Sequence, residues 1–143
     1  MPKKLTDRKQ KVQKKKLGEL LVKCRGEISL RKVADQIGLP PSNLKYIEDG
    51  VNAPTGEVFG KLIAVLNPDA KTRSKMDKLY MAIREVPPQD VCNVIIMNQE
   101  LVSVFRLLNG VVLNPVQIQE LQKQILRIVK ENKNGVADHA EDL

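Results

Sequence analysis

Residues 29–50, SLRKVADQIGLPPSNLKYIEDG, decide the fold of this chain. Ser29 is a residue that commonly caps a helix N-terminus, because its side-chain oxygen accepts a hydrogen bond from a free backbone N–H. Apolar residues with helical spacing follow it: Leu30, Val33, Ala34 and Ile37. Gly38 then fits a left-handed helix end, since it has no Cβ to strain that conformation. The first half of the stretch therefore predicts a short helix that ends in a turn.

The second half of the stretch predicts another short helix. Two consecutive prolines cannot lie inside a helix, but Pro41 suits the first helical position, where no backbone N–H is needed. Leu44 and Ile47 form one apolar side of the residues that follow, and Gly50 ends the pattern. We therefore predict two helices joined by a tight turn, the second over residues 41–49.

Helical patterns continue on both sides, without the alternation that is typical of strands. The apolar spacing predicts helices over residues 17–25, 55–66 and 71–86, then two that meet near Asn98 and a last one over 115–132. An earlier start of the first helix is the alternative, because Val12 continues its apolar stripe. The chain is therefore predicted to be all-α. We expect one helical domain over residues 17–86 and a smaller helical region over 87–132. The acidic tail, residues 133–143, is predicted to be disordered.

The central pair of helices resembles the helix-turn-helix of phage-repressor transcription regulators, the XRE or lambda-repressor-like family. The likeness covers roughly residues 17–70, and it is carried by Ala34, Gly38 and the ending Ile47-Glu48-Asp49-Gly50. The Pro-Thr-Gly-Glu opening at residues 54–57 is also similar to that family. The resemblance implies a five-helix lambda-repressor-like DNA-binding domain followed by a small helical C-terminal region.

The resemblance further implies a repressor that binds duplex DNA sequence-specifically and reads the major groove with the helix over residues 41–49. By this likeness the second helix faces the bases, and the start of the first helix abuts the phosphate backbone. The residues expected to contact DNA are Ser29, Arg31, Lys32, Pro41, Ser42, Asn43, Lys45, Tyr46 and Asn52. Leu30 departs from the family pattern, because many relatives have a phosphate-binding residue there. The alternative for each of these residues is an ordinary solvated surface.

The excess positive charge is gathered at the N-terminus. Residues 1–16 hold eight Lys and Arg against one Asp, which equals the whole net charge of +7. Residues 17–50 hold five basic and five acidic groups, so the helix pair itself is neutral. A basic arm suggests a polyanionic partner, with phosphate contacts expected from Lys11, Lys14, Lys15 and Lys16. A solvated leader that only aids solubility is the alternative.

The last helix carries Ile118, Leu121, Ile125 and Ile128 at spacings of three, four and three residues. Such a seam favours helix–helix pairing, but it is too short for an independent coiled coil. It packs either on the helix over 101–108 of its own chain or across a two-fold axis in a homodimer. The residues expected to form a dimer interface are Leu101, Phe105, Leu108, Ile118, Leu121, Ile125 and Ile128.

Several classes of protein have little support in the sequence. His139 is the single histidine, and Cys24 and Cys92 are far apart, so we expect no metal site and no cofactor. No nucleophile–base pairing or phosphate-binding glycine loop is present, and an enzyme is not expected. With no export signal or membrane span, a cytoplasmic protein with reduced cysteines is expected. The alternative to a repressor is an antitoxin-like module that binds a partner protein through its C-terminal helices.

Overall fold

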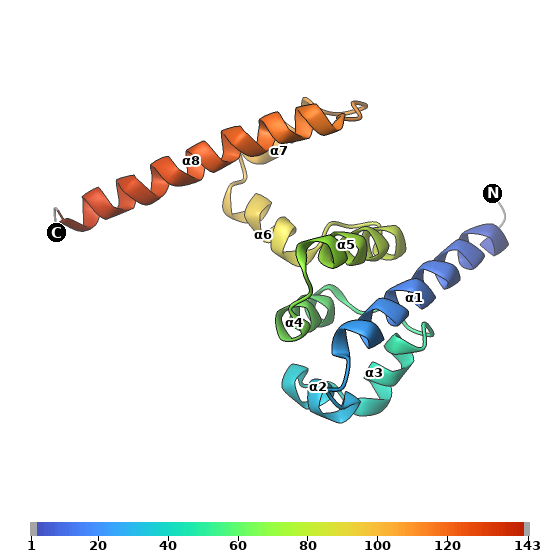
Figure 1. Cartoon of the computed structure of the whole chain (residues 1–143). Helices are drawn as coiled ribbons and strands as arrows, with labels where there is room; N and C mark the ends of the chain where they lie inside the picture. The colour runs from blue at the N-terminus through green and yellow to red at the C-terminus, as the bar shows by residue number, and fades with distance from the viewer. Residues whose placement is uncertain (1–2, 142–143) are drawn as a thin grey trace. The chain divides into compact units, whose positions relative to one another are not determined.

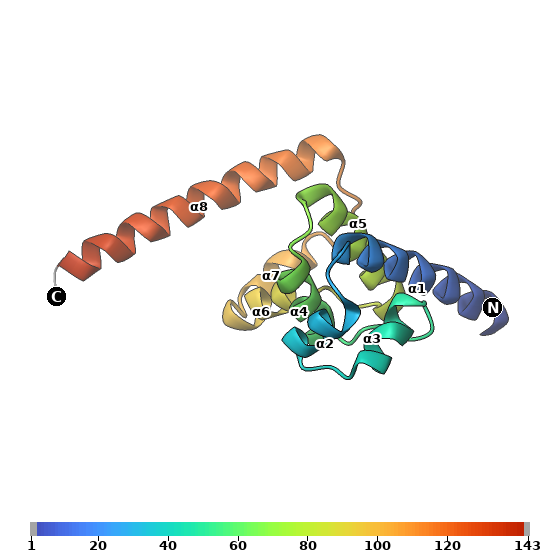
Figure 2. The same cartoon turned by 60° about the horizontal axis from the view of Figure 1, so that its bottom comes forward.

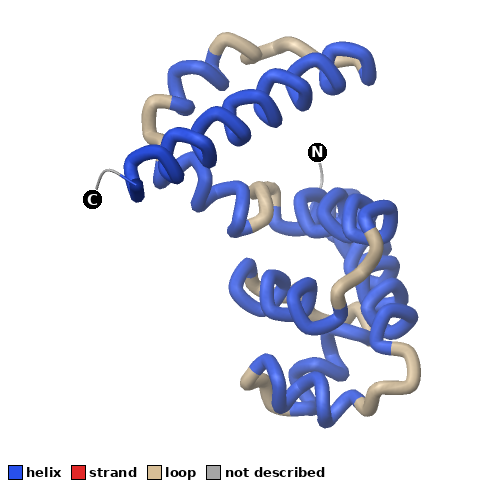
Figure 3. The backbone as a smooth tube through the Cα atoms, turned by 60° about the vertical axis from the view of Figure 1, so that its left-hand side comes forward, coloured by secondary structure: helices blue, strands red, loops and turns tan. Residues whose placement is uncertain are grey.

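The computed structural model describes the backbone of residues 3–141 and the side chains of residues 7–134. These residues form α-helices and no strand (Figure 3), so the all-α prediction is confirmed. The helices are α1 (Lys3–Arg25), α2 (Leu30–Ile37), α3 (Pro41–Glu48), α4 (Gly56–Leu66), α5 (Ala70–Arg84), α6 (Gln89–Met97), α7 (Leu101–Arg106) and α8 (Pro115–Glu141). They divide into two units, of which the first ends at Gln99 and the second begins at Glu100.

Side-chain caps start four of these helices where the sequence predicts a start or close to it. The capping oxygens belong to Ser29, Thr55, Asp69 and Asn114, and each accepts from the N–H three residues later. Asn114 also donates its own N–H to Gln117 Oε1 at 3.0 Å, which closes a reciprocal capping box. At α5, hydrogen bonds from Thr72 hold the pKa of the Asp69 carboxyl below its usual value. Each cap satisfies an N–H that the helix leaves unpaired.

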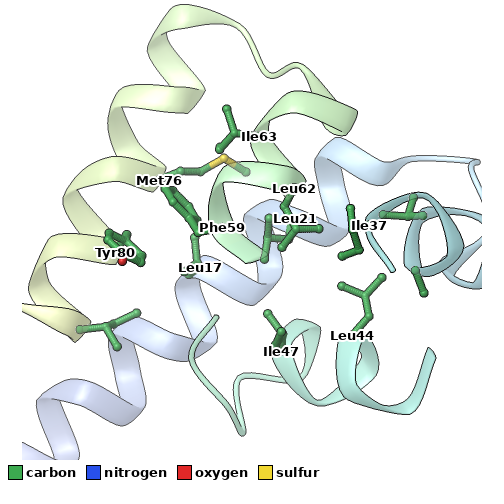
Figure 4. Close-up of a cluster of buried hydrophobic side chains, with 13 residues drawn as sticks. Leu17, Leu21, Ile37, Leu44, Ile47, Phe59, Leu62, Ile63, Met76 and Tyr80 are labelled. Atoms are coloured by element: carbon green, nitrogen blue, oxygen red, sulfur yellow. The ribbon is translucent and has the colours of Figure 1, made fainter. Parts of the chain in front are cut away.

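The core of the first unit is built by aliphatic side chains from α1 to α5 (Figure 4). Its largest fully buried side chains are Leu17, Leu21, Val33, Leu44, Leu62 and Met76. Phe59 and Tyr80 stack on each other, with ring centroids 4.5 Å apart. Burying one such apolar side chain contributes roughly 1.5–3 kcal/mol. This core holds α2 and α3 against the longer α1.

Helix α1 begins well before residue 17, as the position of Val12 on the same apolar stripe allowed. Residues 3–16 were expected to form an arm ahead of a helix over 17–25, but they are the first turns of α1 itself. The reason is that lysine, arginine and glutamine form helices well, and no glycine or proline lies between Lys3 and Leu17. Once Leu17 and Leu21 anchor the helix in the core, adding further turns costs little. Figures 1 and 2 show these turns projecting beyond the other helices of the first unit.

The boundary between the units falls later than the predicted one after residue 86. Helix α6 belongs to the first unit because it contacts α4. Pro88 at its start is buried, and Arg73 Nη2 lies 3.1 Å from Asp90 Oδ2. The two helices predicted to meet near Asn98 are confirmed as α6 and α7.

The second unit has no buried residue among residues 100–134, where side chains are described. Helix α8 was expected to end near Asn132 before a disordered tail, yet it continues to Glu141. No proline interrupts that stretch, and the single glycine, Gly135, costs a helix only about 1 kcal/mol. None of the helices described is both long enough and apolar enough to cross a membrane.

Candidate nucleic-acid interface

The turn between α2 and α3 has the geometry that the sequence predicts. Gly38 has a φ of +69°, a left-handed conformation in which a Cβ would cause strain. This conformation lets the N–H of Leu39 donate to the carbonyl of Ala34 at 2.9 Å, which closes the end of α2. Pro41 then starts α3 at the position where a helix needs no N–H donor. The tight connection places α2 and α3 side by side, as both Figure 1 and Figure 2 show.

Helix α3 has one buried side and one exposed side. Leu44 and Ile47 point into the core (Figure 4), as the apolar spacing predicts. The opposite side presents four polar or aromatic residues to solvent: Ser42, Asn43, Lys45 and Tyr46. Tyr46 is 50% exposed although its ring is largely apolar. An exposed helix face of this kind fits the major groove of B-DNA, which is about 12 Å wide.

The other residues expected to contact DNA are distributed over three places. Ser29, Arg31 and Lys32 are exposed at the start of α2, Pro41 is half-buried at the start of α3, and Asn52 is exposed in the loop after α3. The Ser29 hydroxyl accepts the N–H of Lys32 at 3.1 Å. Its own O–H is still free to donate to a phosphate while it caps the helix.

An ion pair that the sequence pattern did not predict joins the end of α1 to α3. Arg25 donates from Nε to Glu48 Oε1 at 2.7 Å and from Nη2 to Glu48 Oε2 at 3.2 Å. The Glu48 side chain is only 3% exposed, and Arg25 supplies the hydrogen bonds that a carboxylate removed from water requires. The available signal was a carboxylate on the same helix side as Leu44 and Ile47. A charge on an apolar face needs a buried partner.

A second contact that the sequence did not reveal holds the loop carrying Asn52. Arg84, at the end of α5, donates from Nε to the Pro54 carbonyl at 3.0 Å and from Nη2 to the Ala53 carbonyl at 2.9 Å. The two bonds tie the residues that follow α3 to a helix of the core. Asn52 is therefore exposed on a segment with a defined backbone path.

Helix α1 crosses the C-terminal end of α3 at very short range. A Cβ on Gly18 would overlap the backbone oxygen of Glu48, and a Cβ on Gly50 would lie 2.6 Å from the Cα of Lys15. Gly50 also has a φ of +76°, so this position requires glycine for two reasons. These two glycines allow the backbones of α1 and α3 to touch.

This crossing separates the four lysines of the predicted arm into two groups. Lys11, Lys14 and Lys15 lie beside the end of α3, where they and Asp49 to Val51 line a cavity of about 520 Å³. Lys16 lies on a different side of α1 and lines a groove shared with α5. The structure therefore brings three of the four lysines toward the helix pair and points the fourth toward α5.

Lys45 forms an ion pair within α3. Its Nζ lies 3.2 Å from Asp49 Oδ1, one helical turn away, and both side chains are well exposed. Exposed pairs of this kind are worth about 0–1 kcal/mol. The Lys45 ammonium is therefore available to a stronger partner, although Asp49 lowers the local positive charge.

No protein-family model, curated protein or solved structure matches the chain. Evidence for a function therefore comes from the chain's own residues. Among the described residues, no group of three or more His, Cys, Asp or Glu side chains could hold a metal ion. Cys24 is half-buried between the helices, and burial raises the pKa of its thiol. A thiol with a raised pKa is a poor nucleophile.

The residues expected to form a dimer interface are largely uncovered in the second unit. Ile118, Leu121, Ile125 and Ile128 are all exposed along α8, with Ile125 at 58%. On and after α7, Phe105 and Leu108 are also exposed and Leu101 is half-buried. Helix α7 thus does not bury the apolar side of α8 within the chain. The seam is left with apolar surface that a partner would cover.

Proposed function

We propose that this chain is a sequence-specific DNA-binding regulator of transcription, a repressor, that reads the major groove of duplex DNA with α3. The observation that carries the proposal is the outer side of α3. Ser42, Asn43, Lys45 and Tyr46 stand exposed on a helix whose other side is locked into the core. The part-buried Arg25–Glu48 pair and the close crossing at Gly18 hold α3 against α1. A rigid helix with an exposed polar face is what base reading requires.

Each residue of the interface has a role suited to its chemistry. Lys45 donates to guanine O6 and N7, and the ring of Tyr46 packs against a thymine methyl group. Ser42 and Asn43 lie in the first turn of α3, where the positive end of the helix dipole also attracts a phosphate. Ser29, Arg31 and Lys32 contact the backbone at the start of α2. Contacts with phosphate position the protein, whereas those of α3 select the sequence.

The electrostatic part of binding comes from α1. The helix pair itself is neutral, so it supplies little attraction to phosphate. Lys11, Lys14 and Lys15 lie beside the end of α3 and add three positive charges there. In this proposal these lysines contact the phosphates next to the bases that α3 reads.

The proposal includes a homodimer formed through the second unit. One recognition helix reads few base pairs, and two half-sites about 34 Å apart multiply the specificity. The exposed seam of α8, with Phe105 and Leu108, supplies an apolar surface for a second copy. A homodimer would bind an inverted repeat.

A second candidate is an antitoxin-like module whose C-terminal helices bind a different protein. It is favoured by the exposed apolar residues that follow α5. Besides those of α8, they include Val91, Val94, Ile96 and Met97 on α6. The molecular mass of the purified chain in solution distinguishes the two candidates. In a homodimer the second copy covers the apolar side of α8, whereas in a monomer that side stays exposed and can bind a different protein.

The decisive experiment is selection of bound duplexes from a random pool, repeated over a range of salt concentrations. The proposal expects enrichment of an inverted-repeat consensus, with affinity that falls as salt rises. An enriched single half-site would support base reading without the dimer. No enrichment even at low salt would contradict the DNA-binding proposal itself.

A further inference from the structure

A second basic surface lies between α1 and α5, and DNA reading by α3 does not use it. A groove of about 530 Å³ opens there, which we name the α1–α5 groove. Leu20 and Leu79 are half-buried and form its floor. Four exposed lysines and one glutamate surround them: Lys16, Lys23, Lys75, Lys78 and Glu19. The groove therefore combines an apolar floor with a net charge of +3.

The groove is on the side of α1 that faces away from α3. On α1, Gly18 lies against the end of α3, and Arg25 on the same side of the helix pairs with Glu48. Leu20 follows two residues later, about 200° further around the helix at 3.6 residues per turn. Lys16 and Lys23 share the side of Leu20, four residues before and three residues after it. A partner in this groove would leave the exposed side of α3 free.

The chemistry of the groove selects among possible partners. Phosphates of duplex DNA need the lysines but gain nothing from a leucine floor. A small molecule needs a site that encloses most of its surface, whereas only two helices line this groove. An amphipathic helix buries just one apolar side and keeps its flanks near the rim. A third helix with glutamate or aspartate on those flanks would match the lysines.

We infer that the α1–α5 groove is a docking site for an acidic amphipathic helix of a partner protein. The apolar side of that helix covers Leu20 and Leu79, and its carboxylates pair with the lysines at the rim. Rim charges of this type raise the association rate and make binding sensitive to salt. The inference does not depend on DNA binding by α3, since the two surfaces are on different sides of α1.

The test uses the full chain and a fluorescein-labelled synthetic helix with leucines on one side and glutamates on both flanks. Fluorescence anisotropy should show binding that weakens as salt rises. The variant K75E/K78E reverses two exposed charges of the groove and should bind the peptide at least about tenfold more weakly. The matched control is K61E/K71E, which makes the same charge change at exposed lysines outside the groove and should bind like the wild type. Far-UV circular dichroism verifies that each variant is folded.

Further outcomes test the charge complementarity and the class of partner. A peptide with lysines in place of the glutamates should not bind, and its binding would overturn the charge complementarity. If K75E/K78E and K61E/K71E weaken peptide binding equally, the peptide responds only to the net charge of the protein. That result would overturn the inference. Duplex DNA and phosphatidylserine vesicles are tested as alternative probes. Groove-dependent binding of either one, with no binding of the acidic peptide, would assign the groove to that partner instead.

Discussion

Lys45 and Tyr46 are neighbours on the exposed side of α3, and their chemistry suits different features of a base pair. The ammonium of Lys45 is a donor that suits the acceptors of guanine. Tyr46 offers an apolar ring with a hydroxyl at its tip, which suits a thymine methyl group beside a phosphate. Asp49 is 3.2 Å from Lys45 Nζ, so in free protein the lysine already has a weak partner. Under the proposed function, a guanine acceptor would replace Asp49 as the partner of Lys45.

We predict that Lys45→Ala and Tyr46→Ala each lower the affinity for the selected sequence by about 1–3 kcal/mol, because each removes a contact to a base edge. The loss should fall at particular positions of the consensus, measured by competition between single-base variants of the duplex. Lys61→Ala is the matched control, since Lys61 also pairs with an acidic residue one turn away, Glu57 at 3.1 Å. A loss that is uniform across all duplexes would mean that both side chains contact only the backbone.

The sequence predicted the local features of these residues well and the long-range ones poorly. The cap at Ser29, the left-handed Gly38 and the buried positions of Leu44 and Ile47 follow from neighbours a few residues away. The pair between Arg25 and Glu48 joins residues 23 positions apart. Its formation depends on how α1 crosses α3, and no local pattern encodes that crossing.

At the scale of elements, the close contact between α1 and α3 depends on Gly18. This glycine lies inside a helix, where it costs about 0.5–1 kcal/mol relative to alanine. Glycine is nevertheless required at this position, because the Cβ of any other residue would clash with the backbone of Glu48. The position of α3 therefore depends on its direct packing against α1.

We predict that Gly18→Ala destabilises the fold by about 1–3 kcal/mol, because the added methyl group forces α1 and α3 apart. DNA binding should weaken further than stability alone explains, since α3 shifts relative to α2. Gly60→Ala is the opposite control: it adds the same methyl group inside α4, where no atom lies within 4 Å. It should stabilise the chain by about 0.5–1 kcal/mol. Urea unfolding of both variants measures the difference, and a neutral Gly18→Ala would contradict the close crossing.

The basic residues of α1 were predicted in type but not in arrangement. Composition alone shows that residues 1–16 carry the excess charge. It does not show that they continue a helix, because helix formation there depends on the anchoring of Leu17 and Leu21 in the core. The helix then directs Lys11, Lys14 and Lys15 toward the end of α3 and Lys16 toward α5.

We predict that the triple variant K11Q/K14Q/K15Q flattens the salt dependence of DNA binding. Each phosphate contact that is lost should reduce the slope of log affinity against log salt by about 0.9. Three lost contacts would give a change of roughly 2–3 in that slope. Lys16→Gln is the control and should leave the slope unchanged, since this lysine faces α5. Equal effects per residue in both variants would show that α1 acts through its net charge alone.

At the scale of the whole molecule, the two units have different sources of stability. The first unit has a core contributed by α1 to α5, whereas residues 100–134 of the second have none. A short helical segment without a core commonly gains stability by oligomerising. The apolar side of α8 suits a second copy because its flanking positions, Gln117, Gln122, Gln124 and Val129, are uncharged. Two copies could pair there without repulsion between like charges.

We predict that L121N/I125N converts the chain from a dimer to a monomer, because it places two amides in the centre of the apolar seam. Light scattering after gel filtration measures the mass. The control, K123N/K130N, changes two residues of α8 on the side away from the seam and should leave the dimer intact.

The monomer should still bind a single half-site as the wild type does, because α3 and the helices that pack against it belong to the other unit. It should lose the added affinity for the inverted repeat, which requires two linked recognition helices. A wild-type chain that is monomeric by itself would contradict this prediction and favour a different protein as the partner of α8.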